Sequence, residues 1–303
     1  MSLDKQPPSA GSLITYLFDY KNTYMALRNF AEATRRGYGA DLRHFLAYLT
    51  GSLGIGSVSD VERAHVYQYL AELDRRGRAG ATRTRKIAAI KSFFGYLEDM
   101  GLILVNPARR VPRPKQEQHE PRVLTEDEYK RLQEACQGHR RDRAIIELFL
   151  QTGLRLSEVS NLALPDLELP TETTSKLLGA VRVKGKGRKQ RSVSLNWKAC
   201  QAITAYLTER PATACATLFL SKKGLALSAR AIQRIVKKYM SKAGISHASV
   251  HTLRHTFATH MVRKGTNLRV VQEALGHTSL QTTSRYVSLA RELMDEQLQA
   301  NAL

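Results

Sequence analysis

The amino-acid sequence predicts a mainly α-helical protein with a small β-sheet, an α+β chain organised as two domains. Three observations support this prediction. The chain has 303 residues, more than a single hydrophobic core usually holds. Its first third carries apolar side chains at helical spacing almost throughout. The clear strand signal is a pair of alternating segments, "GAVRV" and "RSVSL", which flank a glycine-rich tip and predict a β-hairpin.

A segment rich in proline and charge separates the two predicted domains. The string "NPARRVPRPKQEQHEPRVL" has no apolar periodicity, so residues 107–122 are predicted to be an interdomain linker. A flexible N-terminus of residues 1–10 precedes the helical domain of residues 11–106. Residues 123–288 are predicted to form the second, mixed domain, and residues 289–303 are predicted to form a C-terminal amphipathic helix.

Apolar stripes predict the helices of the first domain. In "ATRRGYGADLRHFLAYL", helical spacing places one stripe on a single face, formed by Tyr38, Leu42, Phe45 and Leu49. The string "SVSDVERAHVYQYLAEL" repeats this pattern, with Ser59 or Asp60 as a candidate N-cap. The first domain is therefore predicted to be helical from end to end.

The last helix of this domain combines an apolar stripe with a basic face. In "TRTRKIAAIKSFFGYLEDMG", apolar residues recur at helical spacing. The basic residues that fall mostly off this stripe are Arg83, Arg85, Lys86 and Lys91. The pattern favours a helix that packs on one side and offers the other to phosphate groups. A solvated basic surface is the alternative.

The second domain is predicted to begin with a capped helix and to contain a second basic helix. Thr125 is a suitable N-cap, and Glu128 completes a capping box three residues later. Further on, "SARAIQRIVKKYMSKAG" directs its isoleucine and valine side chains inward. Arg230, Arg234 and Lys237 then face outward and are predicted to form a second phosphate-binding face.

Basic residues dominate the charge of the chain. Lys and Arg total 47 against 27 Asp and Glu, which gives a formal net charge of +20. Such an excess predicts a polyanionic partner, and nucleic acid is favoured over a membrane because no apolar run approaches the ~18 residues of a spanning helix. The start, "MSLDKQPPSAGSL", has no apolar signal segment, and three widely spaced cysteines fit a reducing compartment. A cytoplasmic location is expected.

The string "SVHTLRHTFATH" gathers His251, Arg254, His255 and His260 into a short segment. Such a cluster suggests either a metal site or a phosphate site. The spacing of His251 and His255 suits a zinc-binding helix, but the HExxH motif requires a glutamate where Thr252 stands. No carboxylate or cysteine follows nearby to complete a zinc site, and the acidic residues of a magnesium site are missing. A phosphate site is therefore favoured, and no metal is predicted.

The glycine-rich hairpin tip, "KGKGRKQ", does not predict nucleotide binding. The phosphate-binding pattern G-x-x-x-x-G-K-[ST] fails because Gly187 follows Lys186. No cofactor is therefore predicted. The tip instead offers cations to DNA, with Arg188 among the predicted DNA-binding residues. The tip also holds Lys186, with Lys184 and Lys189 close to it in sequence.

Six residues that are weak signals singly occur in a fixed order along the chain. They are Arg155, Lys186, His251, Arg254, His277 and Tyr286. They lie in the strings "TGLRLSE", "HTLRHTFATH" and "LRVVQEALGHTSLQTTSRYV" and in the hairpin tip. In this order they resemble the active-site set of the tyrosine recombinases, the phage integrase family, and the strings are most similar to the bacterial Xer branch. The resemblance covers nearly the whole chain. It implies a helical core-binding domain followed by a mixed catalytic domain.

The resemblance implies that duplex DNA is cut and rejoined through a 3′-phosphotyrosyl intermediate. Tyr286 would be the nucleophile. Arg155 and Arg254 would clamp the non-bridging phosphate oxygens, because guanidiniums bind phosphate bidentately and stay charged. Glu158 lies one turn after Arg155, where it can orient that guanidinium. The covalent link conserves the bond energy, so strand joining needs no ATP. The two guanidiniums would do the work that a pair of metal ions otherwise does.

The other members of the set would supply protons and hydrogen bonds. By the resemblance, His251 would take the tyrosine proton, and His277 would add a hydrogen bond to the phosphate. Lys186 would protonate the departing 5′-oxygen, since a hairpin tip can deliver an ammonium group to the DNA. His255 and His260 fall outside the set and are expected to serve packing and hydrogen bonding.

The resemblance also implies an assembly. The expected partner is double-stranded DNA with a specific core site, bound by a homo-tetramer on two sites or by a hetero-tetramer with a second recombinase. The helix of residues 289–303 would then be exchanged between neighbouring protomers, and packing on its own domain is the alternative. Two other functions are weighed against this one. A type IB topoisomerase would relax supercoils as a monomer, and a DNA-binding regulator would carry a relic active site.

Overall fold

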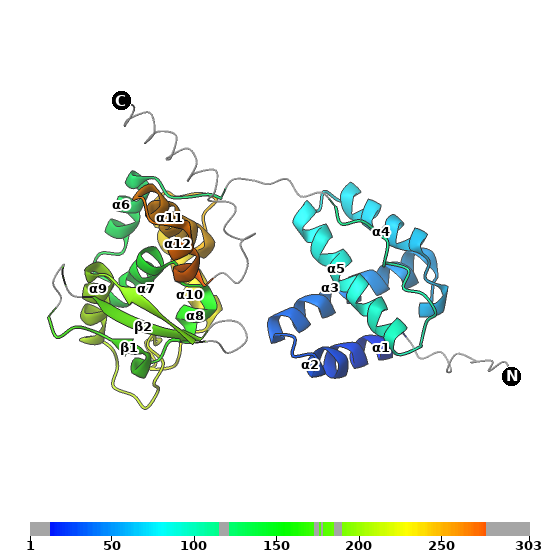
Figure 1. Ribbon diagram of the computed structural model, residues 1–303, viewed down its shortest axis with the longest axis horizontal. Coiled ribbons are helices and arrows are strands. Elements are labelled where there is room, and N and C mark those ends of the chain that lie inside the picture. The colour runs from blue at the N-terminus through cyan, green and yellow to red at the C-terminus, as the bar shows by residue number, and fades with distance from the viewer. Residues whose placement is uncertain (1–12, 115–120, 173–175, 177, 185–189, 277–303) are drawn as a thin grey trace, which may run out of the picture. The chain divides into compact units, whose positions relative to one another are not determined.

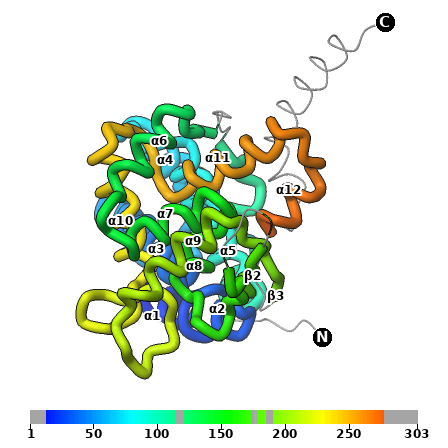
Figure 2. The backbone as a smooth tube through the Cα atoms, turned by 90° about the vertical axis from the view of Figure 1, so that its left-hand side faces the viewer, coloured from blue at the N-terminus to red at the C-terminus, as the bar shows by residue number. Residues whose placement is uncertain are grey.

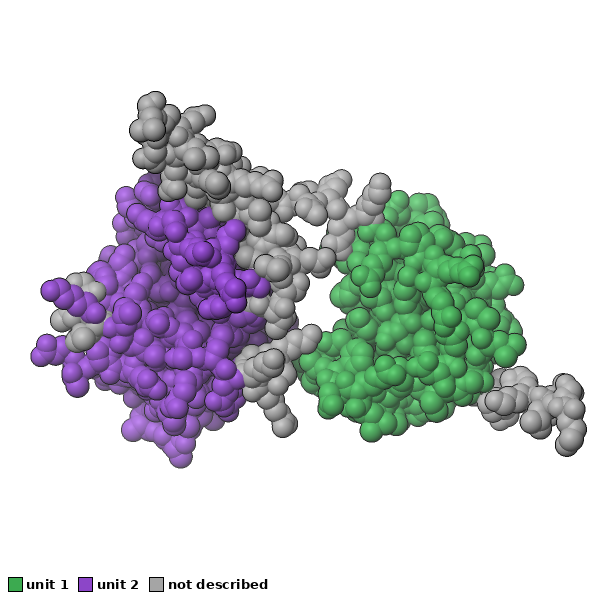
Figure 3. All heavy atoms as spheres, viewed as in Figure 1, with its two compact units in different colours: residues 1–118 green, residues 119–303 purple. Residues whose placement is uncertain are grey.

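The computed structural model describes residues 13–114, 121–172, 176, 178–184 and 190–276 (Figure 1). The chain divides into two compact units, Met1–Gln118 and His119–Leu303, which are green and purple in Figure 3. The division falls inside the segment predicted as a linker. The predicted N-terminal segment 1–10 and the predicted helix 289–303 lie outside the described residues.

The first unit is helical in every element that the structure describes, as the apolar stripes predict. Its elements are α1 (Leu13–Asp19), a π-helical turn (Tyr20–Tyr24), α2 (Met25–Leu27), α3 (Glu32–Leu53), a 3₁₀ turn (Val58–Asp60), α4 (Arg63–Arg75) and α5 (Gly80–Asp99). The predicted stripe of α3 is fully buried at Leu42, Phe45 and Leu49 and half-buried at Tyr38. The Phe45 ring meets the Tyr69 ring of α4 edge to face, with 5.0 Å between the ring centroids.

The predicted start of α4 is wrong by several residues. Ser59 and Asp60 belong to the separate 3₁₀ turn, and α4 begins at Arg63 with Glu62 as its N-cap. The hydroxyl of Ser57 accepts a hydrogen bond from the Ser59 backbone N–H at 3.3 Å. A serine therefore caps a short turn here, a role that its hydroxyl suits as well as a helix start.

The predicted linker 107–122 begins too early. Ala108 and Val111 are buried in the core of the first unit, at 0% and 1% exposure. The Asn106 side chain ties this segment back to α5. Its amide donates to the Lys91 carbonyl oxygen at 3.2 Å, and its carbonyl oxygen accepts from the Ala108 N–H at 2.9 Å. Two isolated apolar side chains in a proline-rich string give no periodicity from which this packing could be predicted.

The second unit is helical around one small sheet. Its helices are α6 (Glu126–Ala135), α7 (Arg140–Thr152), α8 (Leu156–Ser160), α9 (Trp197–Leu207), α10 (Ala229–Lys242), α11 (Val250–Arg263) and α12 (Leu268–Leu275), with a 3₁₀ turn at Leu164–Asp166. The capping box at the start of α6 is confirmed. The Thr125 hydroxyl accepts from the Glu128 N–H at 3.2 Å, and the Glu128 carboxylate accepts from the Thr125 N–H at 3.0 Å.

The predicted hairpin is confirmed as β2 (Gly179–Lys184) paired with β3 (Gln190–Leu195). The pairing is antiparallel, with Val181 opposite Val193, and both of these side chains are buried. A two-residue strand, β1 (Leu167–Glu168), pairs antiparallel with β2 and was not predicted. A segment this short shows no alternation that a sequence pattern could reveal.

Helix α7 forms the centre of the second core. It packs against α9 on one side and α11 on another, and nine of its 13 residues are buried. The chain then runs from α11 into α12, which is orange in Figure 2. Ala258 and Val262 of α11 pack on Val271 and Leu275 of α12. Within the described ranges, no helix is both long enough and apolar enough to span a membrane.

Candidate active site

Arg155 is held at a fixed point just beyond the end of α7. That helix ends at Thr152, and Gly153 adopts a left-handed conformation with φ of 61°. A Cβ atom at Gly153 would lie 2.5 Å from the Phe257 ring and 2.9 Å from the Leu275 side chain, so this turn accepts only glycine. Arg155 then serves as the N-cap residue of α8.

The predicted contact between Arg155 and Glu158 is present. The guanidinium Nη1 of Arg155 donates to Oε1 of Glu158 at 2.9 Å, and the Arg155 backbone N–H donates to Oε2 at 2.8 Å. The Glu158 side chain is only 2% exposed. Burial alone would raise the pKa of this carboxyl. Hydrogen bonds from Arg191 and from the Arg155 backbone outweigh burial and hold the pKa below its ordinary value.

Arg254 is buried and fixed by backbone carbonyls. From the middle of α11, its Nη1 donates to the Gly153 carbonyl oxygen at 2.5 Å and its Nη2 to the Leu275 carbonyl oxygen at 2.7 Å. Nη2 of Arg155 donates to the next carbonyl, that of Gly276, at 2.6 Å. The fold therefore brings the two predicted arginines together at the C-terminal end of α12, where a helix carries partial negative charge.

His251 lies in the first turn of α11, one turn before Arg254. Its side chain is exposed, and its backbone N–H donates to the Ser249 hydroxyl at 3.2 Å. The hydroxyl thus caps the helix that carries both His251 and Arg254. His255 is half-buried and His260 exposed on the same helix.

Four predicted residues, Lys186, Arg188, His277 and Tyr286, lie outside the described residues. For three of them, the adjoining described residues show which elements they follow along the chain. Lys186 and Arg188 belong to the segment that joins β2 to β3. His277 directly follows Gly276, whose carbonyl Arg155 binds.

The sequence analysis missed Arg191, which completes the Glu158 site. Its Nη1 donates to Oε1 of Glu158 at 2.7 Å and its Nη2 to Oε2 at 3.1 Å. A signal for it exists in the strand pattern. In β3 the side chains of Arg191, Val193 and Leu195 alternate on one face, and the last two are buried. An arginine in register with buried apolar residues indicates a paired, inward-facing charge.

The prediction that Lys86 lies on an exposed basic face is wrong. Lys86 is 8% exposed, and its ammonium group lies 3.1 Å from the carboxylate of Asp41, which is itself buried on α3. Arg85 forms an ion pair with the same carboxylate. Arg83 pairs with Asp74 at 2.5 Å. Part of the predicted basic face of α5 is therefore neutralised by packing against its neighbours.

The predicted basic face of α10 is exposed. Arg230, Arg234 and Lys237 point away from the core, while Ile232 and Val236 on the other face are fully buried. Within the part of the chain that the structure describes, none of the three basic side chains forms an ion pair. Their charges are therefore not neutralised by described neighbours.

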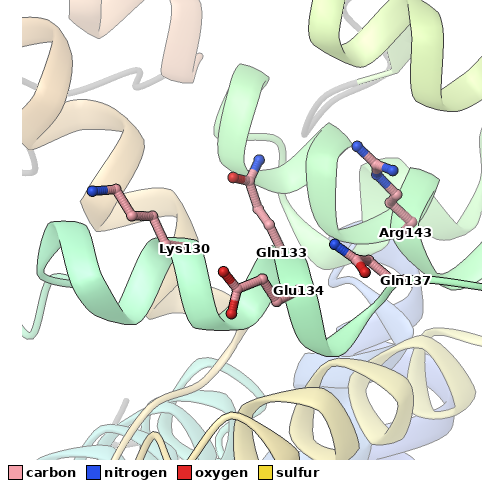
Figure 4. A pocket seen from close by; sticks show the side chains of 5 residues that line it. All are labelled: Lys130, Gln133, Glu134, Gln137 and Arg143. Carbon is pink, nitrogen blue, oxygen red and sulfur yellow. The ribbon is translucent and has the colours of Figure 1, made fainter.

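Other candidate sites offer less chemistry. Within the described ranges, no group of three or more His, Cys, Asp and Glu side chains is placed to hold a metal ion. A pocket between α6 and α7 contains none of the predicted catalytic residues (Figure 4). It is lined by Lys130, Gln133, Glu134, Gln137 and Arg143.

The lowered pKa of Glu158 predicts a stability that depends on pH. The folded-state pKa lies below the ordinary 4.5, so the carboxylate contributes its full stabilisation above pH 4.5. That contribution is lost as the pH falls through the folded-state pKa. We expect the melting temperature of the wild type to fall more steeply with acid than that of Glu158→Gln. Equal acid slopes for the two proteins would contradict the assignment.

Comparison with known proteins establishes the family. Residues 122–292 match the phage integrase family, and residues 17–101 match the phage integrase N-terminal SAM-like domain. The tyrosine recombinase XerC of Pelobacter propionicus is 39% identical over 89% of each chain. The tyrosine recombinase XerD of Listeria monocytogenes is 31% identical over 90% of this chain and 93% of its own.

Solved structures share the fold. XerH bound to its difH substrate in a pre-cleavage complex aligns with a TM-score of 0.67 and 25% identity, over 86% of this chain and 77% of the other. A lambda integrase dimer bound to a COC′ core site gives a TM-score of 0.71 at 18% identity, over 91% and 77% of the two chains. The chain therefore belongs to the phage integrase family of tyrosine recombinases, as the order of its predicted site residues indicated.

Proposed function

We propose that this protein is a site-specific DNA recombinase that cuts and rejoins duplex DNA through a covalent tyrosine intermediate. The observation that carries the proposal is the convergence of Arg155 and Arg254 on the end of α12. Two fixed guanidiniums at one point are suited to a phosphodiester. Relatives named as tyrosine recombinases, which span most of this chain, support the same function.

The two arginines would stabilise the transition state of DNA cleavage. Attack on a phosphodiester passes through a pentacoordinate phosphorus with extra negative charge on the non-bridging oxygens. The carbonyl contacts of Gly153, Leu275 and Gly276 fix both guanidiniums before the substrate arrives. Donors that are already oriented need no reorganisation as charge develops, and this is why such sites are effective. The Arg155 side chain is 35% exposed, which leaves it accessible to a phosphate.

The remaining catalytic roles complete the proposal. Tyr286 attacks the phosphorus and forms the 3′-phosphotyrosyl link. His251 takes the tyrosine proton, and its exposed place one turn before Arg254 supports this role. His277 follows Gly276 directly, and we propose that it donates a hydrogen bond to the same phosphate. Lys186 protonates the departing 5′-oxygen.

DNA with a specific core site is the proposed partner. The XerH structure, which is 25% identical, is a complex with its DNA substrate. Exchange between two sites requires each strand of each duplex to be cut, and each cut needs its own tyrosine. We therefore propose a tetramer on two sites, either a homo-tetramer or a hetero-tetramer with a second recombinase. Exchange of the 289–303 segment between protomers would close such a ring.

A recombination assay separates this function from its rivals. The sites that the protein binds in its source cell are mapped, and two copies of one site are placed in a plasmid. We expect resolved recombinant circles in EDTA and without ATP. Relaxation of supercoils by dilute protein on plasmids without the site would instead indicate a type IB topoisomerase. Site binding without any strand cleavage would indicate a regulator.

The exposed charges of α10 predict a measurable effect on DNA affinity. We expect Arg234→Gln to weaken binding to all DNA sequences and to lower the salt slope of log K by about one, because one phosphate contact is lost. Arg83→Gln on α5 is the matched comparison, since Asp74 already neutralises much of that charge. Its salt slope should change less. The measurement is a fluorescence anisotropy titration over a range of salt concentrations.

The opposite order of these two effects would show that α5, and not α10, provides the phosphate contact. If Arg234→Gln instead loses the preference for one base pair of the site, Arg234 contacts the edge of that base.

A further inference from the structure

Arg191 lies where three segments of the site meet. It is the second residue of β3, directly after the hairpin tip. Its guanidinium binds both oxygens of Glu158, and Oε1 accepts from Arg155 as well, so one buried carboxylate is shared by two arginines. The guanidinium also lies against Gly276. A Cβ atom there would be 2.6 Å from Cζ of Arg191 and 2.8 Å from its Nη1.

The charges in this arrangement do not cancel. Glu158 carries one negative charge, whereas Arg155 and Arg191 carry two positive charges. Arg191 binds the carboxylate through both nitrogens, while Arg155 uses one and directs its other nitrogen to the Gly276 carbonyl. Without Arg191, the buried carboxylate would have Arg155 as its remaining arginine partner. The charge of Arg155 would then be largely compensated before any phosphate arrived.

We propose that Arg191 is a positioning residue that neutralises Glu158 and thereby keeps the charge of Arg155 available to the scissile phosphate. Arg191 acts through Glu158 and does not itself contact the DNA. A lysine could supply the charge at this position. It could not supply the bidentate contact or the flat surface that fits against Gly276. This inference rests on the proposed function, because it assigns a task within that reaction.

The test compares single-turnover rates of covalent complex formation on a nicked duplex at saturating DNA. We expect Arg191→Gln to slow the reaction by about 10- to 100-fold, the scale for residues that orient a reacting group. Glu158→Gln in the Arg191→Gln background restores the net charge of the cluster. This double variant should be about 10-fold faster than Arg191→Gln. Arg182→Gln removes an exposed charge from the same hairpin and should leave the rate unchanged.

A double variant no faster than Arg191→Gln would overturn the charge role. A 5′-bridging phosphorothioate substrate distinguishes an effect through Arg155 from an effect through Lys186, because its leaving group needs no proton. The Arg191→Gln defect should persist on that substrate if Arg155 is the affected group. Full rescue would show that Arg191 acts through Lys186 in the hairpin tip, and the proposal would then be wrong.

Folding and function are separated by two controls. Melting temperatures show whether each variant is folded at the assay temperature. If Arg191→Gln does not fold, the double variant takes its place, since it leaves no unpaired buried charge at Glu158. A rate near that of the wild type then supports the proposal, and a rate near background overturns it. A wild type that forms no covalent complex would reject the proposed function itself, which is a different outcome from a failed rescue.

Discussion

A Tyr286→Phe variant should bind its DNA site with the affinity of the wild type and form no covalent protein–DNA complex. The substitution removes only the nucleophilic hydroxyl and keeps the ring. The loss should therefore be complete in cleavage and absent in binding. A nicked suicide substrate traps the covalent product, which migrates as a slower band on a denaturing gel. The wild type should form this band in EDTA.

A second tyrosine provides the matched control for this experiment. Tyr239 is fully buried and donates a hydrogen bond to Asp142 at 3.0 Å, so its hydroxyl has a structural role. Tyr239→Phe should lower the melting temperature and still form the covalent complex. An adduct that survives in Tyr286→Phe, or a wild type that needs magnesium, would show that another nucleophile or a metal carries out the reaction.

The Lys186→Ala variant should cleave ordinary DNA slowly, by about 10²- to 10⁴-fold, because the departing 5′-oxygen then has no general acid. A 5′-bridging phosphorothioate leaves without a proton, so it should largely restore the rate. Lys184→Ala is the nearest comparison, since Lys184 is the exposed last residue of β2. Equal defects of Lys186→Ala on both substrates would mean that this lysine only binds DNA. A larger defect in Lys184→Ala, rescued by sulfur, would move the role of general acid to that residue.

The sequence could predict those parts of the site that depend on local spacing. Arg155 and Glu158 are one helical turn apart, so their contact follows from the chain alone. The capping box of Thr125 and Glu128 and the β2–β3 hairpin are local in the same sense. The order of site residues in the resembled family then identified Arg254 among the many arginines of the chain. None of these inferences required knowledge of which distant segments meet.

What the sequence could not predict depends on contacts between distant segments. Lys86 and Arg85 are consecutive on one basic helix. Asp41 on α3 forms an ion pair with each of them, and Lys86 is buried in this contact. Both results depend on where α3 packs against α5. Arg191 and Glu158 are 33 positions apart, and their meeting depends on how the sheet packs on α8. Ala108 and Val111 are buried because Asn106 ties their segment back to α5. Each of these cases needs the tertiary fold.

The anchoring of Arg254 to the ends of two helices constrains how homologous chains can differ in length. Its two carbonyl partners, Gly153 and Leu275, stand at the C-terminal ends of α7 and α12. One inserted residue in either helix would rotate that end by about 100° and shift it by about 1.5 Å, which would carry the carbonyl away from the guanidinium. The exposed residues 211–214, in the segment between α9 and α10, have no such task, and insertions there cost little closure entropy. Viable deletions and insertions should therefore gather in that segment and avoid α7 and α12.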